Sequence, residues 1–207
     1  EFSVTSTPIR IDVWSDFVCP WCFLASTSLE QLQQSHPVEI IWRAYELRPE
    51  GSPPMPEHYR QRIEESFPQL QQMARERFGV DIPTFRIGTD SRLAHIGFKF
   101  AEEHGHGEAY HRAVFRAHWQ ENKDIDKVGV LADIAVSVGL DREAFIAALQ
   151  SEDHLQAVLG DIEQAQLMGL QGVPAIIFAT KYLVSGAQPY SVLVGVAEEV
   201  QSRLAQA

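Results

Sequence analysis

The sequence has little cysteine, no long apolar run and a shortage of positive charge, and each shortage excludes a class of protein. Two cysteines among 207 residues are too few for the disulfide framework that stabilises many small secreted domains. They are also only half of the roughly four ligands of a structural zinc site. No apolar stretch approaches the ~20 residues that cross a bilayer. Lysine and arginine total 17 against 28 acidic residues, without a basic cluster, so we expect neither a nucleic-acid nor a membrane partner.

Length and composition are those of an ordinary folded protein. Hydrophobic residues make up 45% of the chain and charged residues 22%, which excludes disorder as the dominant state. A chain of this length builds one large core, or one core that carries an inserted subdomain. Residues 1–5 lack the basic and apolar segments of a secretion signal. Together with the scarcity of cysteine, this predicts a cytoplasmic protein, although a signal that had been removed would leave the same start.

Hydrophobic periodicity predicts strands near both ends of the chain and helices between them. The predicted elements are, in order, a strand over 9–14, a helix that ends near 36, a strand over 38–45, a Pro-rich loop over 46–56, helices from 58 to about 150 punctuated by Pro and Gly (Pro68 among them), a helix over 155–168, strands over 175–178 and 182–184, and a helix over 190–204.

This order of elements predicts an α/β fold. The β-α-β segment at the start and the β-β-α segment at the end are expected to form one sheet with flanking helices. The stretch of about 95 residues between them is too long for a simple loop. We therefore expect it to form an inserted helical subdomain.

The strongest functional signal is the motif Cys19-Pro20-Trp21-Cys22. A cysteine attacks as the thiolate, and a helix start stabilises a thiolate through its free N–H groups and its dipole. Pro20 suits the first turn of a helix, where its missing N–H costs little. Cys22 lies one helical turn behind Cys19, so it can resolve a mixed disulfide formed at Cys19. We predict that Cys19 is the nucleophile and Cys22 the resolving thiol.

The competing interpretation of two cysteines at this spacing is half of a metal site. The second half is missing, because the histidines at 95, 104, 106, 111 and 118 complete no ligand set. We therefore predict no metal, and interpret the histidines as exposed or hydrogen-bonded residues. The position before a helix and the proline inside the motif favour redox chemistry.

Four segments of the chain resemble the DsbA family of thioredoxin-like proteins. The segments are residues 15–23 (SDFVCPWCF), 42–49 (WRAYELRP), 172–174 (GVP) and 184–189 (VSGAQP). They look most like the FrnE-like branch, which is related to 2-hydroxychromene-2-carboxylate isomerases. The resemblance spans nearly the whole chain.

The resemblance implies a thioredoxin-like fold with an inserted all-helical subdomain. Residues 1–56 and 152–207 would form the thioredoxin-like domain, and 57–151 the insertion. It also implies a cis peptide bond between Val173 and Pro174, close in space to Cys19. A cis proline exposes a backbone edge that can pair with an extended substrate. Val173, Pro174, Pro20 and Trp21 are therefore expected to be motif and substrate-binding residues.

Three functions follow as hypotheses. The first is a thiol–disulfide oxidoreductase that acts on protein or small-molecule disulfides. The second is a glutathione-dependent isomerase or transferase, although the isomerase branch typically has serine in place of the cysteine pair. The third is a non-catalytic peptide-binding module. No cofactor is expected, and glutathione stays open as a reductant or ligand. The direction of electron flow and the oligomeric state are not encoded in any pattern of the sequence.

Other residues near the motif are predicted to be structural. Asp12 and Asp16 stand before it, where a buried carboxylate can shuttle protons to a resolving thiol, but a solvent-facing Asp12 and a structural Asp16 are favoured. Trp21 is equally compatible with substrate contact and with packing beside the motif. The aromatic residues of the central helices are expected to form its core. They are Phe98, Phe100, Tyr110, Phe115 and Trp119.

Overall fold

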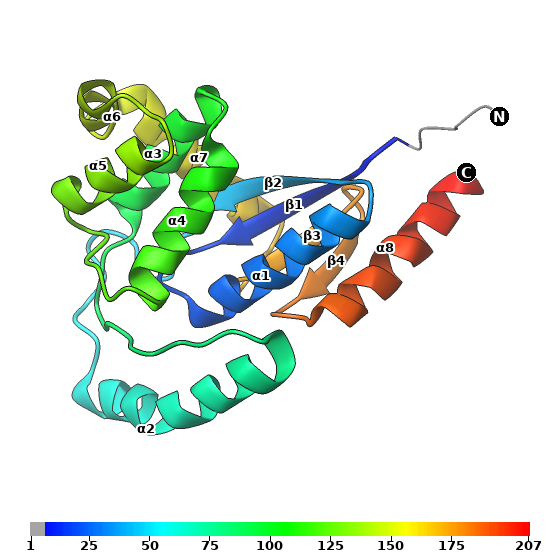
Figure 1. Ribbon diagram of the computed structural model, residues 1–207, viewed down its shortest axis with the longest axis horizontal. Helices are drawn as coiled ribbons and strands as arrows, with labels where there is room; N and C mark the ends of the chain where they lie inside the picture. Colours follow the sequence, from blue (N-terminus) through cyan, green and yellow to red (C-terminus); the bar gives the residue numbers. More distant parts are fainter. Residues whose placement is uncertain (1–6) are drawn as a thin grey trace.

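The computed structural model describes residues 7–207, so the expectation about a secretion signal in residues 1–5 lies outside the described part. A four-stranded sheet has the order β2-β1-β3-β4 (Figure 1). Strand β1 is parallel to β2 and antiparallel to β3, and β3 is antiparallel to β4. The strands are β1 (Ile9–Ser15), β2 (Val38–Ala44), β3 (Ala175–Phe178) and β4 (Tyr182–Ser185).

Helices cover both faces of this sheet (Figure 1). Helices α1 and α8 pack together over one face, and α7 packs against β2 on the other. The remaining helices lie between β2 and α7 in the chain. The helices are α1 (Pro20–Ser35), α2 (Glu57–Met73), the π-helix η1 (Ala74–Phe78), α3 (Arg92–Glu103), α4 (Gly107–Trp119), α5 (Val128–Ser137), α6 (Arg142–Ala148), α7 (Glu152–Leu167) and α8 (Tyr190–Ala205).

The alternation of side chains along β1 decides which residues pack against α1 and α8 and which pack against α7. Ile11 and Val13 are fully buried in the main core with α1 and α8. Trp14 points to the opposite face, where it packs with Ala165 of α7 and its indole N–H donates to the Asp161 carbonyl at 2.9 Å. Because side chains of a strand alternate between faces, a seven-residue strand supplies both layers.

The prediction that Asp12 faces solvent is wrong. Asp12 is 5% exposed, because α7 covers the face to which it points. Its carboxylate pairs with Arg43 at 3.2 Å and with Arg10 at 2.9 Å. Arg43 also reaches Asp161 at 3.6 Å, and the Lys99 ammonium lies 2.5 Å from Asp161. An ion-pair network therefore links β1, β2, α3 and α7.

The helices between β2 and α7 share a core of their own aromatic residues. All five predicted core aromatics are buried, and Tyr110 is fully so, with its hydroxyl donating to the Ala94 carbonyl at 3.0 Å. Phe17 of the segment before Cys19 packs against Phe115. The helical layer is thus continuous with the segment that carries the cysteines. The α/β fold with a helical insertion is confirmed, while the division at residues 57 and 151 stays a prediction.

Two details of the helical stretch differ from the prediction. Residues 79–91 form no helix, and Pro68 lies inside α2 instead of ending a helix. None of the residues of α2 is buried, so the carbonyl that Pro68 leaves without a donor can bind water.

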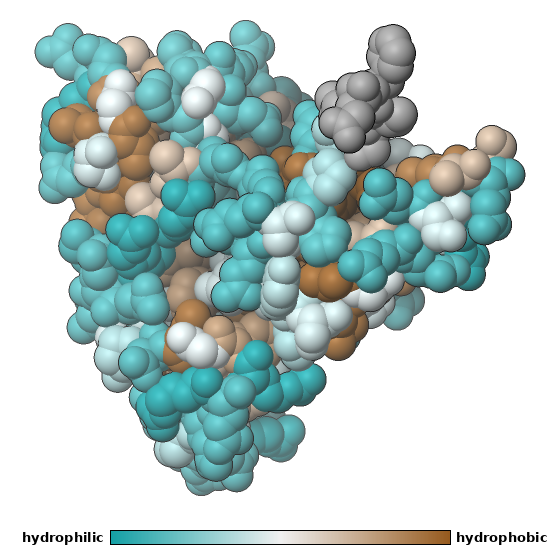
Figure 2. Space-filling view, turned by 45° about the vertical axis from the view of Figure 1, so that its right-hand side comes forward, coloured by the Kyte–Doolittle hydropathy of each residue, from teal (hydrophilic) through white to brown (hydrophobic). Residues whose placement is uncertain are grey.

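Most of the surface in Figure 2 is hydrophilic, and apolar side chains show there as separate patches. Within residues 7–207, no helix has both the length and the hydropathy to cross a membrane.

Candidate active site

Cys19 lies at the junction between the sheet and α1. It is the residue before the helix, with Pro20 in the first helical position. Its carbonyl accepts the N–H of Phe23 at 3.2 Å, and its own N–H donates to the Asp16 carbonyl at 3.1 Å. The sulfur therefore stands at the positive end of the helix dipole, as the sequence predicted.

Cys22 lies one turn further along α1 and deeper in the protein. Cys19 is 3% exposed and Cys22 1%, and both are free thiols. The Asp16 backbone N–H approaches the Cys22 Sγ at 3.5 Å. Trp21 is 47% exposed and is the residue of the motif that projects into solvent. The motif thus holds two buried sulfurs, of which Cys22 is the deeper, and an exposed indole.

The two thiols differ in acidity. A hydrogen bond from the Cys22 side chain, helped by the backbone N–H groups of Cys22 and Trp21, lowers the pKa of Cys19. Burial and the negative charge of Asp16 oppose this shift. Burial, with the adjacent Cys19 sulfur, raises the pKa of Cys22 well above its ordinary value. Cys19 is therefore the group that ionises first, while Cys22 holds its proton.

The segment at 173–174 joins the motif from the far end of the chain. The Val173–Pro174 peptide bond is cis. The Cys19 Sγ lies 4.0 Å from the Val173 carbonyl oxygen, and the Pro174 carbonyl accepts the Gly186 N–H at 3.1 Å. Strand β3 starts at the next residue, so its pairing with β1 places Pro174 level with the end of β1. The structure thus brings Cys19, Cys22 and Val173 together, with Pro174 adjacent, and their catalytic roles stay a prediction.

Sequence reasoning missed a buried pair beside the motif. His95 Nε2 of α3 lies 3.2 Å from Asp16 Oδ1 and 3.0 Å from the Tyr45 carbonyl oxygen. The Leu47 N–H donates to Asp16 Oδ2 at 2.8 Å. Asp16 had a signal in the sequence, its place three residues before Cys19. His95 had none, because 79 residues separate it from Asp16.

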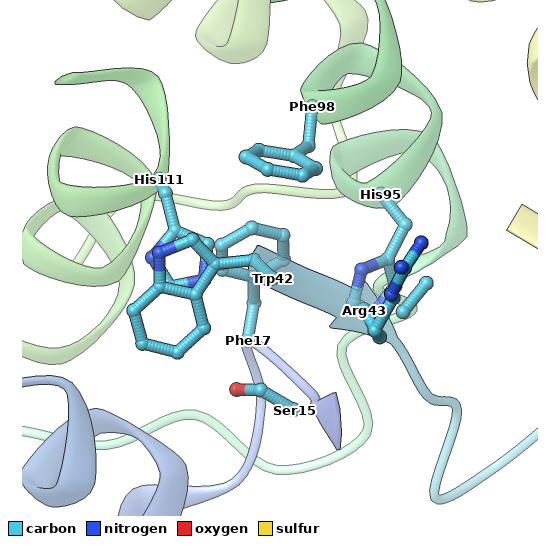
Figure 3. A pocket seen from close by; sticks show the side chains of 8 residues that line it. Ser15, Phe17, Trp42, Arg43, His95, Phe98 and His111 are labelled. Carbon is cyan, nitrogen blue, oxygen red and sulfur yellow. The ribbon is translucent and has the colours of Figure 1, made fainter. Parts of the chain in front are cut away.

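A small cavity adjoins this pair. It measures about 10 Å³ and is lined by Ser15, Phe17, Trp42, Arg43, Ala44, His95, Phe98 and His111. Figure 3 shows the rings of Phe98, His111 and Trp42 on one side and His95 on the other, with the Ser15 hydroxyl below. A space of this size holds about one water molecule and no substrate.

The described residues contain no group of three or more His, Cys, Asp or Glu side chains placed to hold a metal ion. His111 stacks on Trp42 with ring centroids 3.9 Å apart, and His118 lies against Trp119. Both are buried. These two histidines pack among the aromatic side chains of the helical layer. The prediction that the histidines are exposed or hydrogen-bonded is wrong for His118, which has no hydrogen-bond partner among residues 7–207.

A thioredoxin-like sheet with two cysteines of different acidity at the start of a helix defines the class of thiol oxidoreductases. Residues 10–196 match the DsbA-like thioredoxin domain. The chain therefore belongs to the DsbA-like thioredoxin family of oxidoreductases, as its sequence predicted. Its place in the FrnE-like branch stays a prediction.

Three similar proteins illustrate the range of the family. The uncharacterized protein YwbO of Bacillus subtilis is 35% identical over 151 residues, which cover 70% of this chain and 74% of that protein. The 2-hydroxychromene-2-carboxylate isomerase of Pseudomonas putida is 27% identical over 146 residues, 68% of this chain and 71% of the isomerase. The crystal structure of a probable DsbA oxidoreductase from Streptomyces coelicolor superposes with a TM-score of 0.79 at 26% identity, and covers 92% of this chain and 89% of that one.

Proposed function

We propose that the protein is a thiol–disulfide oxidoreductase that cycles Cys19 and Cys22 between dithiol and disulfide against protein or small-molecule disulfides. The observation that carries the proposal is the asymmetry of the two thiols. The pKa of Cys19 is lowered and that of the adjacent Cys22 is raised. A nucleophile must be a thiolate, whereas a resolving thiol must keep its proton until a mixed disulfide exists.

The reaction would proceed in two displacements. The Cys19 thiolate attacks one sulfur of the substrate disulfide, forms a mixed disulfide and releases the other substrate sulfur as a thiolate that takes up a proton. Cys22 then loses its proton, attacks the Cys19 sulfur and releases the second substrate thiol. The substrate gains two electrons and the protein becomes the Cys19–Cys22 disulfide. Two external thiols, for example two glutathione molecules, would restore the dithiol, and the same steps in reverse would oxidise a substrate.

Substrate binding is assigned to the surface around Trp21, Val173 and Pro174. The Val173 carbonyl lies beside Cys19, and a backbone carbonyl at this place can accept a hydrogen bond from an extended peptide. Trp21 is exposed and offers a large apolar contact next to the nucleophile. No cofactor is needed for this cycle, and glutathione enters only as reductant or ligand. A cytoplasmic location stays part of the proposal.

The test is a pair of single substitutions, assayed by reduction of a protein disulfide with glutathione as the electron donor. Cys19→Ser should abolish turnover, because no thiolate remains to attack. Cys22→Ser should also lose turnover and, when it is incubated with the protein disulfide without glutathione, should accumulate a mixed disulfide at Cys19, which intact-mass measurement detects. Wild-type turnover in either variant, or a mixed disulfide trapped at Cys22 in Cys19→Ser, would contradict the assignment of roles.

A second candidate function is a glutathione-dependent isomerase, which the similarity to the Pseudomonas putida enzyme favours. An isomerase of this kind needs one nucleophile or glutathione site and no resolving thiol. Cys22→Ser would then keep its full activity on a 2-hydroxychromene-2-carboxylate substrate. If the wild-type protein shows no thiol exchange and Cys22→Ser keeps the isomerase activity, the isomerase function would replace the oxidoreductase proposal.

A further inference from the structure

The Asp16 carboxylate is buried beside the redox motif and accepts hydrogen bonds at both oxygens. Asp16 is 1% exposed. Its Oδ2 accepts the Leu47 N–H at 2.8 Å, and its Oδ1 faces His95 Nε2 at 3.2 Å. A buried carboxylate is costly unless donors surround it. These two donors explain how a charge is kept at this place.

His95 has its tautomer set by its neighbours. Its Nε2 lies within hydrogen-bond distance of two oxygens, the Tyr45 carbonyl at 3.0 Å and the Asp16 carboxylate at 3.2 Å. Both oxygens accept and neither donates, so Nε2 must carry the proton that the two acceptors share. His95 is 4% exposed, and its ring packs against Phe17 with centroids 5.0 Å apart. The ring is thus held in one orientation.

The main chain of Asp16 touches both cysteines. Its carbonyl accepts the Cys19 N–H at 3.1 Å, and its N–H approaches the Cys22 Sγ at 3.5 Å. The same residue therefore fixes the backbone before Cys19, offers a donor to Cys22 and places a negative charge near the Cys19 sulfur. That charge raises the pKa of Cys19, against the hydrogen bonds that lower it.

We infer that Asp16 and His95 form a positioning pair that tunes the thiolate of Cys19 by holding one negative charge beside the motif, with part of that charge neutralised by the His95 N–H. The pair also connects three separate segments, the turn before α1, the end of β2 and helix α3. This inference rests on the proposed function, because a tuned thiolate matters only if Cys19 is the nucleophile. The pair does not touch a substrate, and it acts through Cys19.

Three substitutions test the inference through the pH profile of Cys19 alkylation, followed in the full chain by site-resolved mass spectrometry with iodoacetamide. Asp16→Asn removes the charge at nearly constant shape, so the midpoint should move down by about one pH unit. His95→Leu leaves the Leu47 N–H as the remaining donor to the Asp16 carboxylate. The less neutralised charge should disfavour the Cys19 thiolate, so the midpoint of Cys19 alkylation should move up. His95→Gln keeps an N–H donor and should stay near the wild-type midpoint.

Asp12→Asn is the matched control. Asp12 is a second buried carboxylate just before the motif, but its partners are Arg10 and Arg43 and it contacts neither cysteine. Its loss should lower stability and leave the Cys19 midpoint unchanged. A structural role for Asp16 and His95 would give the same result as this control.

Opposite shifts in Asp16→Asn and His95→Leu, with rescue by His95→Gln, support the pair. An unmoved midpoint, or a shift in the same direction for both losses, overturns it. If Asp16→Asn does not fold, the two His95 variants still decide the question. Alkylation needs no disulfide substrate, so a failure here is distinct from the failure of the proposed function, which is judged by disulfide turnover.

Discussion

His118 is fully buried beside the Trp119 ring. Neither of its ring nitrogens has a hydrogen-bond partner within the described residues. Burial lowers its pKa to about 4, so the folded protein holds this histidine neutral. An unfolded chain binds the proton already near pH 6.5. Between these two values the unfolded state binds more protons, so the free energy of unfolding must fall as the pH falls.

We expect His118→Leu to flatten the acid side of the stability profile. At pH 5 the wild-type protein should have lost about 2 kcal/mol at this site relative to pH 7.5. His111 is also buried with a lowered pKa, so it adds to the loss in both proteins and cancels in their difference. Urea unfolding at the two pH values measures the effect. A variant whose stability falls with pH as steeply as that of the wild type would contradict the assignment to His118.

Trp21 offers a test of substrate contact separate from folding. Its side chain is 47% exposed, so Trp21→Ala should change the free energy of unfolding by about 0.5 kcal/mol or less. If the indole meets substrate, KM for a protein disulfide should rise while the Cys19 alkylation profile stays in place. A variant with the wild-type KM would assign the indole no part in binding.

At the residue scale, the sequence predicted what is local and missed what is distant. Cys19, Pro20 and Cys22 lie within four residues, so helix geometry alone relates them. The sequence favours a structural role for Asp16, because its partner His95 lies far away along the chain. His95 comes from another helix, and only the packing of α3 against the turn before α1 brings its Nε2 to the Asp16 carboxylate.

The buried carboxylate of Asp161 links helix α7 to strand β2 and helix α3. Asp161 is 6% exposed. It pairs with Lys99 of α3 at 2.5 Å and accepts the Ala44 N–H of β2 at 2.9 Å. Lys99 is itself 7% exposed. Without Asp161, a buried ammonium and a buried backbone N–H would lose their partner, and such losses are far more costly than the loss of a surface pair.

Asp161→Ala should therefore destabilise the protein by about 3–5 kcal/mol. Glu163→Ala is the control, because Glu163 is an exposed acid on the same helix and its loss should cost about 0.5 kcal/mol or less. Denaturant unfolding of the two variants gives the comparison. Equal losses in both would show that α7 is held by apolar packing and not by this carboxylate.

At the element scale, periodicity placed the strands and most helices, but it did not tell which faces are covered. The alternation in β1 suggests a solvent-facing Asp12, because the sequence of the strand does not show that α7 covers this side of the sheet. Pro68 predicts a helix boundary, although the exposed helix α2 accommodates it. The errors on Asp12 and Pro68 both concern the surroundings of a strand or helix. These surroundings depend on how distant segments pack.

At the scale of the whole molecule, the sheet brings together two ends of the chain. The β-α-β and β-β-α patterns predicted one sheet, and pairing of β1 with β3 supplies the contact that places Val173 at the Cys19 sulfur. Helices α2 to α6 are inserted between these halves. The insertion contributes His95 and Phe115 to the surroundings of the two cysteines, so these surroundings depend on both parts of the fold.

The opposite pKa shifts of the two cysteines also make global stability depend on redox state and pH together. In the unfolded, reduced chain both thiols titrate near about 8.5. The lowered pKa of Cys19 means that the unfolded state binds more protons below this value, so the stability of the reduced protein rises as the pH approaches it. The raised pKa of Cys22 has the opposite sign, because above this value the unfolded chain loses a proton that the folded protein keeps.

The stability of the reduced protein minus that of the disulfide form should therefore rise from pH 6, peak near about pH 8.5 and then fall. All other groups titrate in both forms and cancel, and the effect of the disulfide on chain entropy does not depend on pH. Urea unfolding of both forms between pH 6 and 10 measures the difference. A steady fall across this range would mean that folding does not lower the pKa of Cys19, whereas a steady rise would mean that folding does not raise the pKa of Cys22.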